Sequence, residues 1–484
     1  MIRRTLICVF AGLLAAPCHA APPERKTNLL LILTDNQGAW TLGCYGNPDI
    51  RTPNIDRLAA EGMRFSRAFA SNAVCSPTRA TLLTGLIPSQ HGVHCFLDNK
   101  YMIGPEAYNT LAEFRTLPKI LAEAGYTCGL TGKWHLGANL TPQEGFSYWI
   151  TMVHGHTSEF YDVPVIENGQ VRKEPKYATE LWTEHAVRFL RQNRDRPFFL
   201  YLAYNGPYGL GGLLNHPARN RHAALYADQP LWSFHRDAAH PWLFNNREFL
   251  NNPVSIRRVA AETSGVDDGV GEVMAELKRL GLDEHTLVVY TADQGWMGGT
   301  NGLWGMGDHT RPLSAFDQMM HVPLIFRHPG AIRPASQSDL LVSNYDFLPT
   351  VLGYLGLAEV LRGAAPKSPG RDFSAALRGE PLTWDNVVSY EMEYVRAVRT
   401  AEWKYVHRPD GPWELYDLKH DPFEKFNLYG QPMHVEVQQE LKQRLEAFFR
   451  QTADPKYDLY RGGRSKASLL SRRADPPPPR GTPK

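Results

Sequence analysis

The 484-residue sequence has few cysteines, and their spacing excludes two common small-domain scaffolds. The six are Cys8, Cys18, Cys44, Cys75, Cys95 and Cys128. They are not spaced like the ligands of a structural zinc site or the bridges of a disulfide-rich domain. Pairing among Cys44, Cys95 and Cys128 stays open, whereas Cys75 stands apart because its neighbours in the sequence are polar.

Neither sign of charge is in excess, which argues against a nucleic-acid partner. Lys and Arg together number 52, and Asp and Glu number 50. Seven of the basic residues and one acid lie in the last 24 residues, from Arg461 to Lys484. Without that tail and the first 20 residues, the chain holds 43 basic and 49 acidic residues. Such a body offers no basic surface for a nucleic acid, so we expect no such partner.

Long apolar runs are missing beyond the N-terminus. The first twenty residues, MIRRTLICVFAGLLAAPCHA, combine two arginines, an apolar stretch too short to cross a bilayer and a small-residue end. This pattern is typical of a secretory signal peptide, with cleavage expected after Ala20. No later segment is long and apolar enough to cross a membrane. We therefore predict a secreted or periplasmic protein that has no transmembrane segment after signal cleavage.

Apolar runs alternate with amphipathic stretches over residues 26–370. Several runs are apolar throughout, as expected of strands that are buried on both faces of a sheet. Their alternation with helices predicts an α/β domain with a large, mostly parallel sheet sandwiched by helices. Residues 209–253 show no clear period and are expected to form a long loop. We expect strands at 27–35, 63–70, 127–132, 196–205, 285–295 and 322–330, and helices at 52–62, 117–126 and 266–282.

The pattern changes in the last quarter of the chain. Residues 386–408 and 412–418 read as short antiparallel strands, and 434–451 has the apolar period of an amphipathic helix. We therefore predict a smaller α+β subdomain with an antiparallel sheet over residues 371–460. The remaining stretch, 461–484, is basic and rich in proline and is expected to be a disordered tail.

Oxygen-bearing side chains follow two of the expected strands. Asp35 and Asn36 come after the first strand, and Asp293 and Gln294 after a late one. In a mostly parallel sheet, chemistry gathers at the edge where the strands have their carboxyl ends. Four side-chain oxygens suit a hard cation, so we predict a site for Ca²⁺, with Mg²⁺ as the alternative.

The stretch NAVCSPTRATLLTG, at 72–85, places Cys75 in a polar context at the start of an expected helix. The start of a helix directs free amide groups and a positive dipole end toward an anion. Arg79 lies in the same stretch, and Lys133 and His135 follow another expected strand. These donors suit an anionic sulfate or phosphate ester, and Cys75 lies where a nucleophile is needed.

The stretch around Cys75 resembles the signature of the type I sulfatases of the alkaline-phosphatase-like superfamily, in which C-x-P-x-R is followed by a leucine and T-G. Other stretches resemble family segments in the family's order. They include LLLILTDNQG, PSQHGV, LPKILAEAGYTCGLTGKWHLG, PFFLYLAYNGP, LVVYTADQG and WELYDLKHDPFEKFNL, and they extend over residues 26–450. The resemblance implies a sulfuric ester hydrolase of the α/β fold predicted above.

The resemblance also implies how the catalytic site is completed. A maturation enzyme that generates formylglycine oxidises the signature cysteine, here Cys75. One hydroxyl of the hydrated aldehyde then attacks sulfur, and the second expels sulfate. By the same resemblance, Arg79 holds the hydrate and the metal shell, Lys133 bridges the hydrate and the sulfate, and His135 positions or deprotonates the hydrate.

Both predicted metal pairs depart from the family's pattern. The first pair is usually two aspartates, but here it is Asp35 and Asn36. The second is usually Asp-Asn or Asp-His, but here it is Asp293 and Gln294. The predicted ligand set therefore carries two negative charges instead of three, which predicts weaker binding of the cation.

The substrate side of the site departs from the pattern too. Tyr208 stands where the family often has a histidine, and the usual downstream lysine is replaced by the stretch GMGDHTRP. We expect His309 from that stretch to join the catalytic set. Tyr208, Arg311 and Asn205 are expected to bind the substrate.

The predicted function is hydrolysis of a sulfate ester of a carbohydrate by an exported enzyme. Two alternatives stay open. One is a phosphodiesterase or phosphonate monoester hydrolase of the same superfamily, which is supported by Tyr208 and the altered cations. The other is a non-catalytic binder of sulfated glycans, which would have no need of the complete maturation motif around Cys75.

Overall fold

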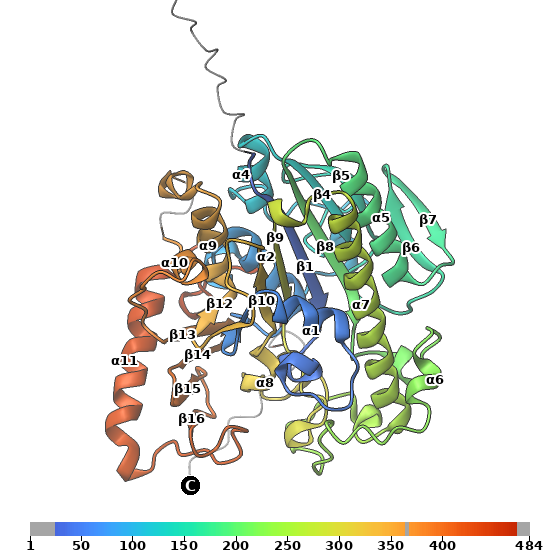
Figure 1. The fold of residues 1–484 in the computed structure, drawn as a ribbon. Coiled ribbons are helices and arrows are strands. Elements are labelled where there is room, and N and C mark those ends of the chain that lie inside the picture. Colours follow the sequence, from blue (N-terminus) through green and yellow to red (C-terminus); the bar gives the residue numbers. More distant parts are fainter. Residues whose placement is uncertain (1–24, 364–366, 472–484) are drawn as a thin grey trace, which may run out of the picture.

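The computed structural model describes residues 25–363 and 367–471, and a ten-stranded sheet runs through its middle (Figure 1). In sheet order the strands are β11 (Ser336–Ser338), β2 (Met63–Phe65), β10 (Leu324–Arg327), β9 (Thr286–Ala292), β1 (Asn28–Asp35), β8 (Phe198–Pro207), β4 (Thr127–Gly132), β5 (Phe146–Met152), β6 (Val163–Glu167) and β7 (Gln170–Glu174). The central strands from β9 to β5 are parallel to one another. Strands β10, β6 and β7 run antiparallel to their neighbours. The prediction of a large, mostly parallel sheet is therefore confirmed.

Helices cover both faces of this sheet (Figure 1). Successive side chains of a strand point to opposite faces. In β1, Leu30 and Ile32 pack under one set of helices, and Leu31 and Leu33 under the other. The first set is α1 (Pro53–Ala60), α5 (Ala178–Gln192) and α7 (Pro253–Arg279), and the second is α2 (Cys75–Thr84), α4 (Leu117–Glu123) and α9 (Phe347–Tyr354). All of β1 is buried, which is why its sequence is nearly apolar throughout.

Helix α7 begins at Pro253, whereas the sequence pattern predicted a helix over 266–282. The start carries a recognisable signal, because the Asn252 side chain caps the helix and proline occupies the first position. The first half of the helix lacks a plain apolar stripe. Arg258 is buried there and donates hydrogen bonds to the backbone oxygens of residues 213, 216 and 217. This buried arginine interrupts the apolar period on which the prediction depended.

The predicted C-terminal subdomain is a four-stranded antiparallel sheet with one long helix (Figure 1, orange and red). Its elements are β13 (Val388–Met392), β14 (Val395–Arg399), β15 (Trp403–His407), β16 (Glu414–Asp417) and α11 (Val435–Thr452). Val398 and Tyr405 pack in the cluster that includes α11, whereas Ala397 and Val406 pack against the large domain. Both faces of the small sheet are therefore covered.

Short elements complete the chain. Up to the start of α7 at Pro253, the predicted long loop over 209–253 contains only the short helix α6 (Ala223–Tyr226) and two 3₁₀ turns. The remaining elements are β3 (Ala68–Phe69), which pairs with β12 (Val342–Ser343), and the helices α3 (Pro88–His91), α6 (Ala223–Tyr226), α8 (Asp317–Met320) and α10 (Ser374–Leu377).

Residues 461–471 are part of the folded body, so the tail predicted to begin at 461 was placed too early. Ala467 and Leu470 are buried, and the backbone N–H of Lys466 donates to the oxygen of Gly92 at 2.7 Å. The prediction followed the basic and proline-rich composition, which belongs mostly to the later residues. Those residues, 472–484, and the predicted signal peptide lie outside the described part of the chain.

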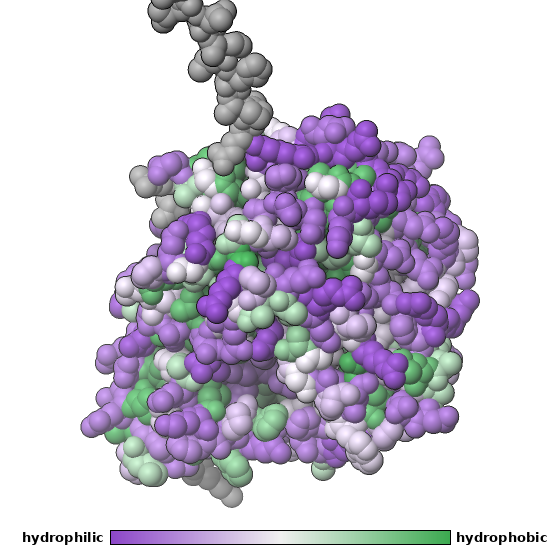
Figure 2. Space-filling view, viewed as in Figure 1, coloured by the Kyte–Doolittle hydropathy of each residue, from purple (hydrophilic) through white to green (hydrophobic). Residues whose placement is uncertain are grey.

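No disulfide joins the cysteines of the described chain. Cys44, Cys75, Cys95 and Cys128 all carry free thiols, which answers the question that the sequence left open. Among the helices of the described residues, none is long and apolar enough to cross a bilayer. The face shown in Figure 2 is mostly hydrophilic, with small and separate hydrophobic patches.

Candidate active site

Four neighbouring parallel strands bring polar residues to one edge of the large sheet. Strands β9, β1, β8 and β4 lie side by side in that order. Asp293 follows β9, Asp35 ends β1, Tyr208 follows β8 and Lys133 follows β4. The parallel pairing therefore gathers residues that are far apart in the sequence.

Gly132 allows the turn that presents Lys133. Its φ is +109°, and a Cβ at this position would lie 1.8 Å from the backbone oxygen of Ala203 in β8. Because any side chain would collide with that strand, glycine is required here.

The four predicted metal ligands meet in the buried interior. The backbone N–H groups of Asn36 and Gln294 donate to Asp293 Oδ1 at 3.1 and 2.9 Å, and Gln294 Nε2 donates to Asn36 Oδ1. Asp35 Oδ1 and Gln294 Oε1 are buried and have no hydrogen-bond partner among the described residues. Buried oxygens are normally satisfied, so this donor set fits a cation that binds oxygen.

The candidate cation site depends on amide oxygens as well as carboxylates. Nowhere in the described chain do three His, Cys, Asp or Glu side chains converge as a metal-binding group. At this edge, Asp35 and Asp293 are the acids, and Asn36 and Gln294 contribute amides. The candidate cation site in the folded protein therefore has two carboxylates, which is the number inferred from the sequence, instead of the three that are usual in the family.

Two buried cations balance the two carboxylates. Arg79 donates from Nε and Nη2 to Asp293 Oδ2 at 3.0 and 2.9 Å, and Lys133 Nζ donates to Asp35 Oδ2. Arg79 Nη1 also donates to the backbone oxygen of Lys133 at 2.7 Å, which ties the two cations together. Burial, followed by the charge of Asp35, raises the pKa of Asp293 to about 6, and Arg79 and Lys133 act in the opposite direction.

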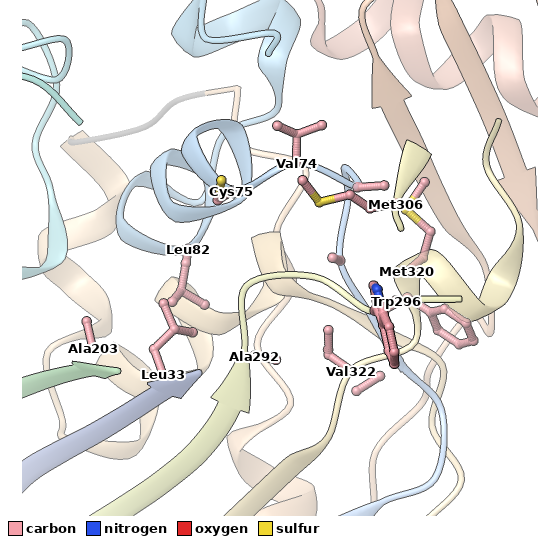
Figure 3. Packing of buried hydrophobic residues seen from close by; sticks show 14 of the residues in the cluster. Leu33, Val74, Cys75, Leu82, Ala203, Ala292, Trp296, Met306, Met320 and Val322 are labelled. Carbon is pink, nitrogen blue, oxygen red and sulfur yellow. The ribbon is translucent and has the colours of Figure 1, made fainter. Parts of the chain in front are cut away.

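Cys75 is the first residue of α2 and is buried beside these charges. Figure 3 shows it on the side of the sheet where Leu33 of β1 and Ala292 of β9 reach the ends of their strands. Burial raises the pKa of the Cys75 thiol to about 12, although Lys133 lowers it. An unmodified thiol here is protonated at neutral pH and is therefore a weak nucleophile.

Two histidines and a tyrosine lie next to these groups. His135 Nε2 is 3.3 Å from the backbone oxygen of Leu97, and its ring centroid is 5.5 Å from that of His156. His156 Nδ1 lies 3.2 Å from the hydroxyl of Tyr208, whose ring centroid is 5.5 Å from Lys133 Nζ. Burial and then the charge of Lys133 lower the pKa of both histidines, that of His156 to about 4, so both are neutral near pH 7. No role could be assigned to His156 from the sequence, because nothing in its loop indicates this contact.

A cavity of about 1050 Å³ opens beside these residues. Tyr208, His309 and Arg311, for which the sequence predicts contact with substrate, line this cavity, and His156 lines it too. His309 Nδ1 lies 2.8 Å from Asp308 Oδ1. Arg311 donates to the backbone oxygens of residues 308 and 310 and lies against the ring of Phe244.

The structure does not bring Asn205 into this cavity. Its Oδ1 accepts a hydrogen bond from Trp182 Nε1 at 2.8 Å, and its Nδ2 lies 3.3 Å from Thr157 Oγ1. The side chain is buried, and both ends of its amide are occupied. Thr157 itself lines the cavity, so Asn205 positions a cavity residue from behind.

Comparison with known families agrees with this geometry. The chain matches the family described as Sulfatase over residues 27–357, and the one described as N-sulphoglucosamine sulphohydrolase, C-terminal, over residues 309–451. The first match covers well over half of the chain, so this protein belongs to the sulfatase family. The resemblance to type I sulfatases, the alkaline-phosphatase-like fold and the class of sulfuric ester hydrolases are confirmed.

Individual relatives extend over nearly the whole chain. The N-acetylglucosamine-6-O-sulfatase of Bacteroides thetaiotaomicron is 28% identical, with 95% of this chain and 94% of that protein covered. The structure of BT4656 in complex with its substrate D-glucosamine-2-N,6-O-disulfate has a TM-score of 0.70 at 25% identity and covers 88% of this chain and 98% of that one. The phosphonate monoester hydrolase of Agrobacterium radiobacter, with a TM-score of 0.65 at 23% identity over 89% and 97% of the two chains, shares the fold alone.

Proposed function

We propose that this protein is an exported sulfatase that hydrolyses a sulfate ester of a carbohydrate through a formylglycine derived from Cys75. The observation that carries the proposal is the buried cluster of Cys75, Arg79, Lys133 and four oxygen-bearing side chains beside a cavity of about 1050 Å³. Two of the proteins named above, the N-acetylglucosamine-6-O-sulfatase and BT4656 with its disulfated glucosamine substrate, support a sugar as the alcohol part of the ester.

The cation, Ca²⁺ as the first choice, would be held by Asp35, Asn36, Asp293 and Gln294. When bound, it polarises an oxygen of the sulfate or of the nucleophile. A formylglycine hydrate at position 75 would supply the hydroxyl nucleophile for the sulfur atom. The start of α2 adds a positive dipole end at the same place, which favours the negative charge of the sulfate.

The chain's own cations fix the reacting groups. Arg79 is held by Asp293 and by the backbone of Lys133, so its guanidinium is already oriented before substrate enters. Lys133 is buried beside Asp35 and offers its ammonium to sulfate oxygens. His135 Nδ1 has no hydrogen-bond partner among the described residues and could accept a hydrogen bond from a hydroxyl at position 75. Burial and nearby cations hold the pKa of His135 well below the ordinary value, so it orients that hydroxyl as a neutral, weakly basic group. Preorganised groups of this kind need no rearrangement during the reaction.

Turnover of a panel of substrates tests the function. We expect the matured protein to release sulfate from at least one sulfated monosaccharide, and to hydrolyse phosphodiesters and phosphonate monoesters at least about 100-fold more slowly in kcat/KM. A preference for a phosphodiester or a phosphonate would favour the alternative hydrolase. Tight binding of sulfated sugars without release of sulfate would instead identify a glycan-binding protein.

His309 is proposed to assist the departing oxygen, with Arg311 and Tyr208 as the other candidates. His309 Nδ1 lies 2.8 Å from Asp308 Oδ1 and 3.5 Å from the backbone nitrogen of Met306, which leaves Nε2 as the nitrogen available to a ligand in the cavity. Replacing His309 with alanine should lower kcat about 10²–10³-fold on a sugar sulfate, because a preorganised donor is lost. The loss should be smaller on 4-nitrophenyl sulfate, whose phenolate leaves without a proton.

Thermal unfolding and a second variant separate catalysis from folding in this test. The exposed His285 lies at the start of β9, away from the cavity lining, and His285→Ala should stay within about twofold of the unmodified enzyme. If His309→Ala also stays within twofold on the best sugar sulfate, then His309 only supports its loop, and Arg311 and Tyr208 become the candidates.

A further inference from the structure

The C-terminal segment over residues 466–471 is fixed against the body at both ends. At its start, Lys466 Nζ donates to the backbone oxygen of Thr110 at 2.7 Å, and the backbone N–H of Lys466 is also bonded. At its end, the backbone N–H and the hydroxyl of Ser471 donate to Glu393 Oε2 at 2.9 and 2.7 Å. Glu393 lies between β13 and β14, so the C-terminal subdomain holds this end.

The residues between these two attachments face the large cavity. The cavity is lined by Ser468, Leu469, Leu470 and Ser471. Of the described residues from 461 to 471, no others line it. Leu469 is 46% exposed although it is a large aliphatic residue. Ser468 Oγ is buried and has no hydrogen-bond partner within the described chain. The segment thus presents an aliphatic surface, with an unpartnered hydroxyl just behind it, a combination typical of small-molecule sites.

The charges of the cavity restrict what can lie against this segment. The acids among the described lining residues are Glu159, Asp308 and Glu393, and the only Lys or Arg among them is Arg311. Glu393 is bonded to the segment itself, so its negative charge lies next to Ser471. A second sulfate placed against the segment would be repelled, whereas hydroxyl and CH groups of a sugar would be accommodated.

We propose that residues 468–471 form a specificity wall that contacts an uncharged face of the sugar ring carrying the sulfate ester. The inference rests on the proposed function, and it adds that the preferred sugar has no second anionic group on the face that meets this wall. Leu469 packs against CH groups of the ring, and Ser468 Oγ, after rotation of its side chain toward the cavity, exchanges a hydrogen bond with a ring hydroxyl.

The test compares a sugar sulfate with a small ester in the full-length, matured protein. Leu469→Ala and Ser468→Ala should each raise KM about five- to tenfold for the best monosulfated monosaccharide of the panel, because the ring loses an aliphatic contact or a hydrogen bond. Both variants should leave kcat within about twofold. They should also leave kcat/KM for 4-nitrophenyl sulfate unchanged, since that ester carries no sugar ring to reach the wall.

Two controls address the rest of the tail. Arg464→Ala changes an exposed residue that is absent from the cavity lining, and it should alter neither substrate. A chain ending at Ser471 lacks the basic residues beyond it and should also behave like the full chain. If this shortened chain alone shows a raised KM for the sugar, cations of the tail bind the substrate, and the wall proposal is overturned.

Binding to the Cys75→Ala variant separates failure of this inference from failure of the proposed function. The best monosulfated monosaccharide should bind that variant at least about tenfold more tightly than its disulfated counterpart, and Leu469→Ala should weaken its binding. If the Leu469 and Ser468 substitutions weaken sugar binding in a protein that hydrolyses no ester, the inference about residues 468–471 is supported and the proposed enzyme function is wrong. Unchanged binding and KM in both wall variants, or a preference for the disulfated sugar, would overturn the wall itself.

Discussion

Replacing Cys75 with alanine is expected to abolish sulfate ester hydrolysis, with a loss of kcat of about 10⁴-fold or more. Removal of a nucleophile that acts as a unit with its neighbours leaves only the residual effect of binding and charge. The side chain is buried and small, so the variant should still fold. Initial rates with the best sugar sulfate, together with thermal unfolding of the same preparation, measure both effects.

A matched variant and a mass measurement complete this experiment. Cys128 is also buried but lies in β4, where its sulfur is 3.5 Å from the backbone oxygen of Pro118, so Cys128→Ala should keep the rate within about twofold. In the active enzyme, the tryptic peptide 68–79 should have the lower mass of formylglycine in place of Cys75. A fully active enzyme in which this peptide keeps an unmodified thiol would contradict the proposed chemistry, since burial keeps that thiol protonated at neutral pH.

Removal of the proposed cation is expected to lower kcat about 10³-fold, with recovery on addition of Ca²⁺. Asp35 Oδ1 and Gln294 Oε1 are buried without partners, so loss of the cation should also lower the temperature of unfolding. Metal content by elemental mass spectrometry, unfolding temperature and rate should therefore change together during dialysis against a chelator. Unchanged metal content and rate after exhaustive chelation would show that the assigned ligand set is wrong.

The low charge of the ligand set allows a sharper version of the same experiment. Asn36→Asp adds a third carboxylate at a position whose φ of +55° an aspartate tolerates. This variant should bind Ca²⁺ at least about tenfold more tightly, because affinity rises with the number of charged ligands. Gln431→Glu adds the same charge at an exposed position in the C-terminal subdomain and should leave the affinity unchanged. Equal affinities for both variants would place the cation elsewhere.

The sequence alone determined the large sheet and the positions of the main polar residues along it. A strand buried on both faces must be nearly apolar, so β1 and β9 could be recognised from local composition. The residue at which such a strand ends is equally local, which is why Asp35, Lys133 and Asp293 could be assigned to one edge. The Cys75 motif and the start of its helix are contained in one short stretch of chain.

Only the tertiary structure decided which side chains meet at the cavity. His156 reaches Tyr208 from a loop without any recognisable pattern, and Asn205 is turned away by its bonds to Trp182 and Thr157. These outcomes depend on which strands are neighbours and on how each loop packs, and neither is encoded in a local period. A residue's chemical type limits what it can do, but its partners are set by the whole fold.

The C-terminal segment shows the same limit most clearly. Its composition predicted a tail from residue 461, yet Lys466 and Ser471 hold residues 466–471 against two separate parts of the body. Ser471 is bonded to Glu393, which lies 78 positions earlier in the chain. Local sequence determines where strands and helices form, because burial and capping act over a few residues. The wall of the cavity was decided by long-range hydrogen bonds and packing, which exist only once the two domains are folded together.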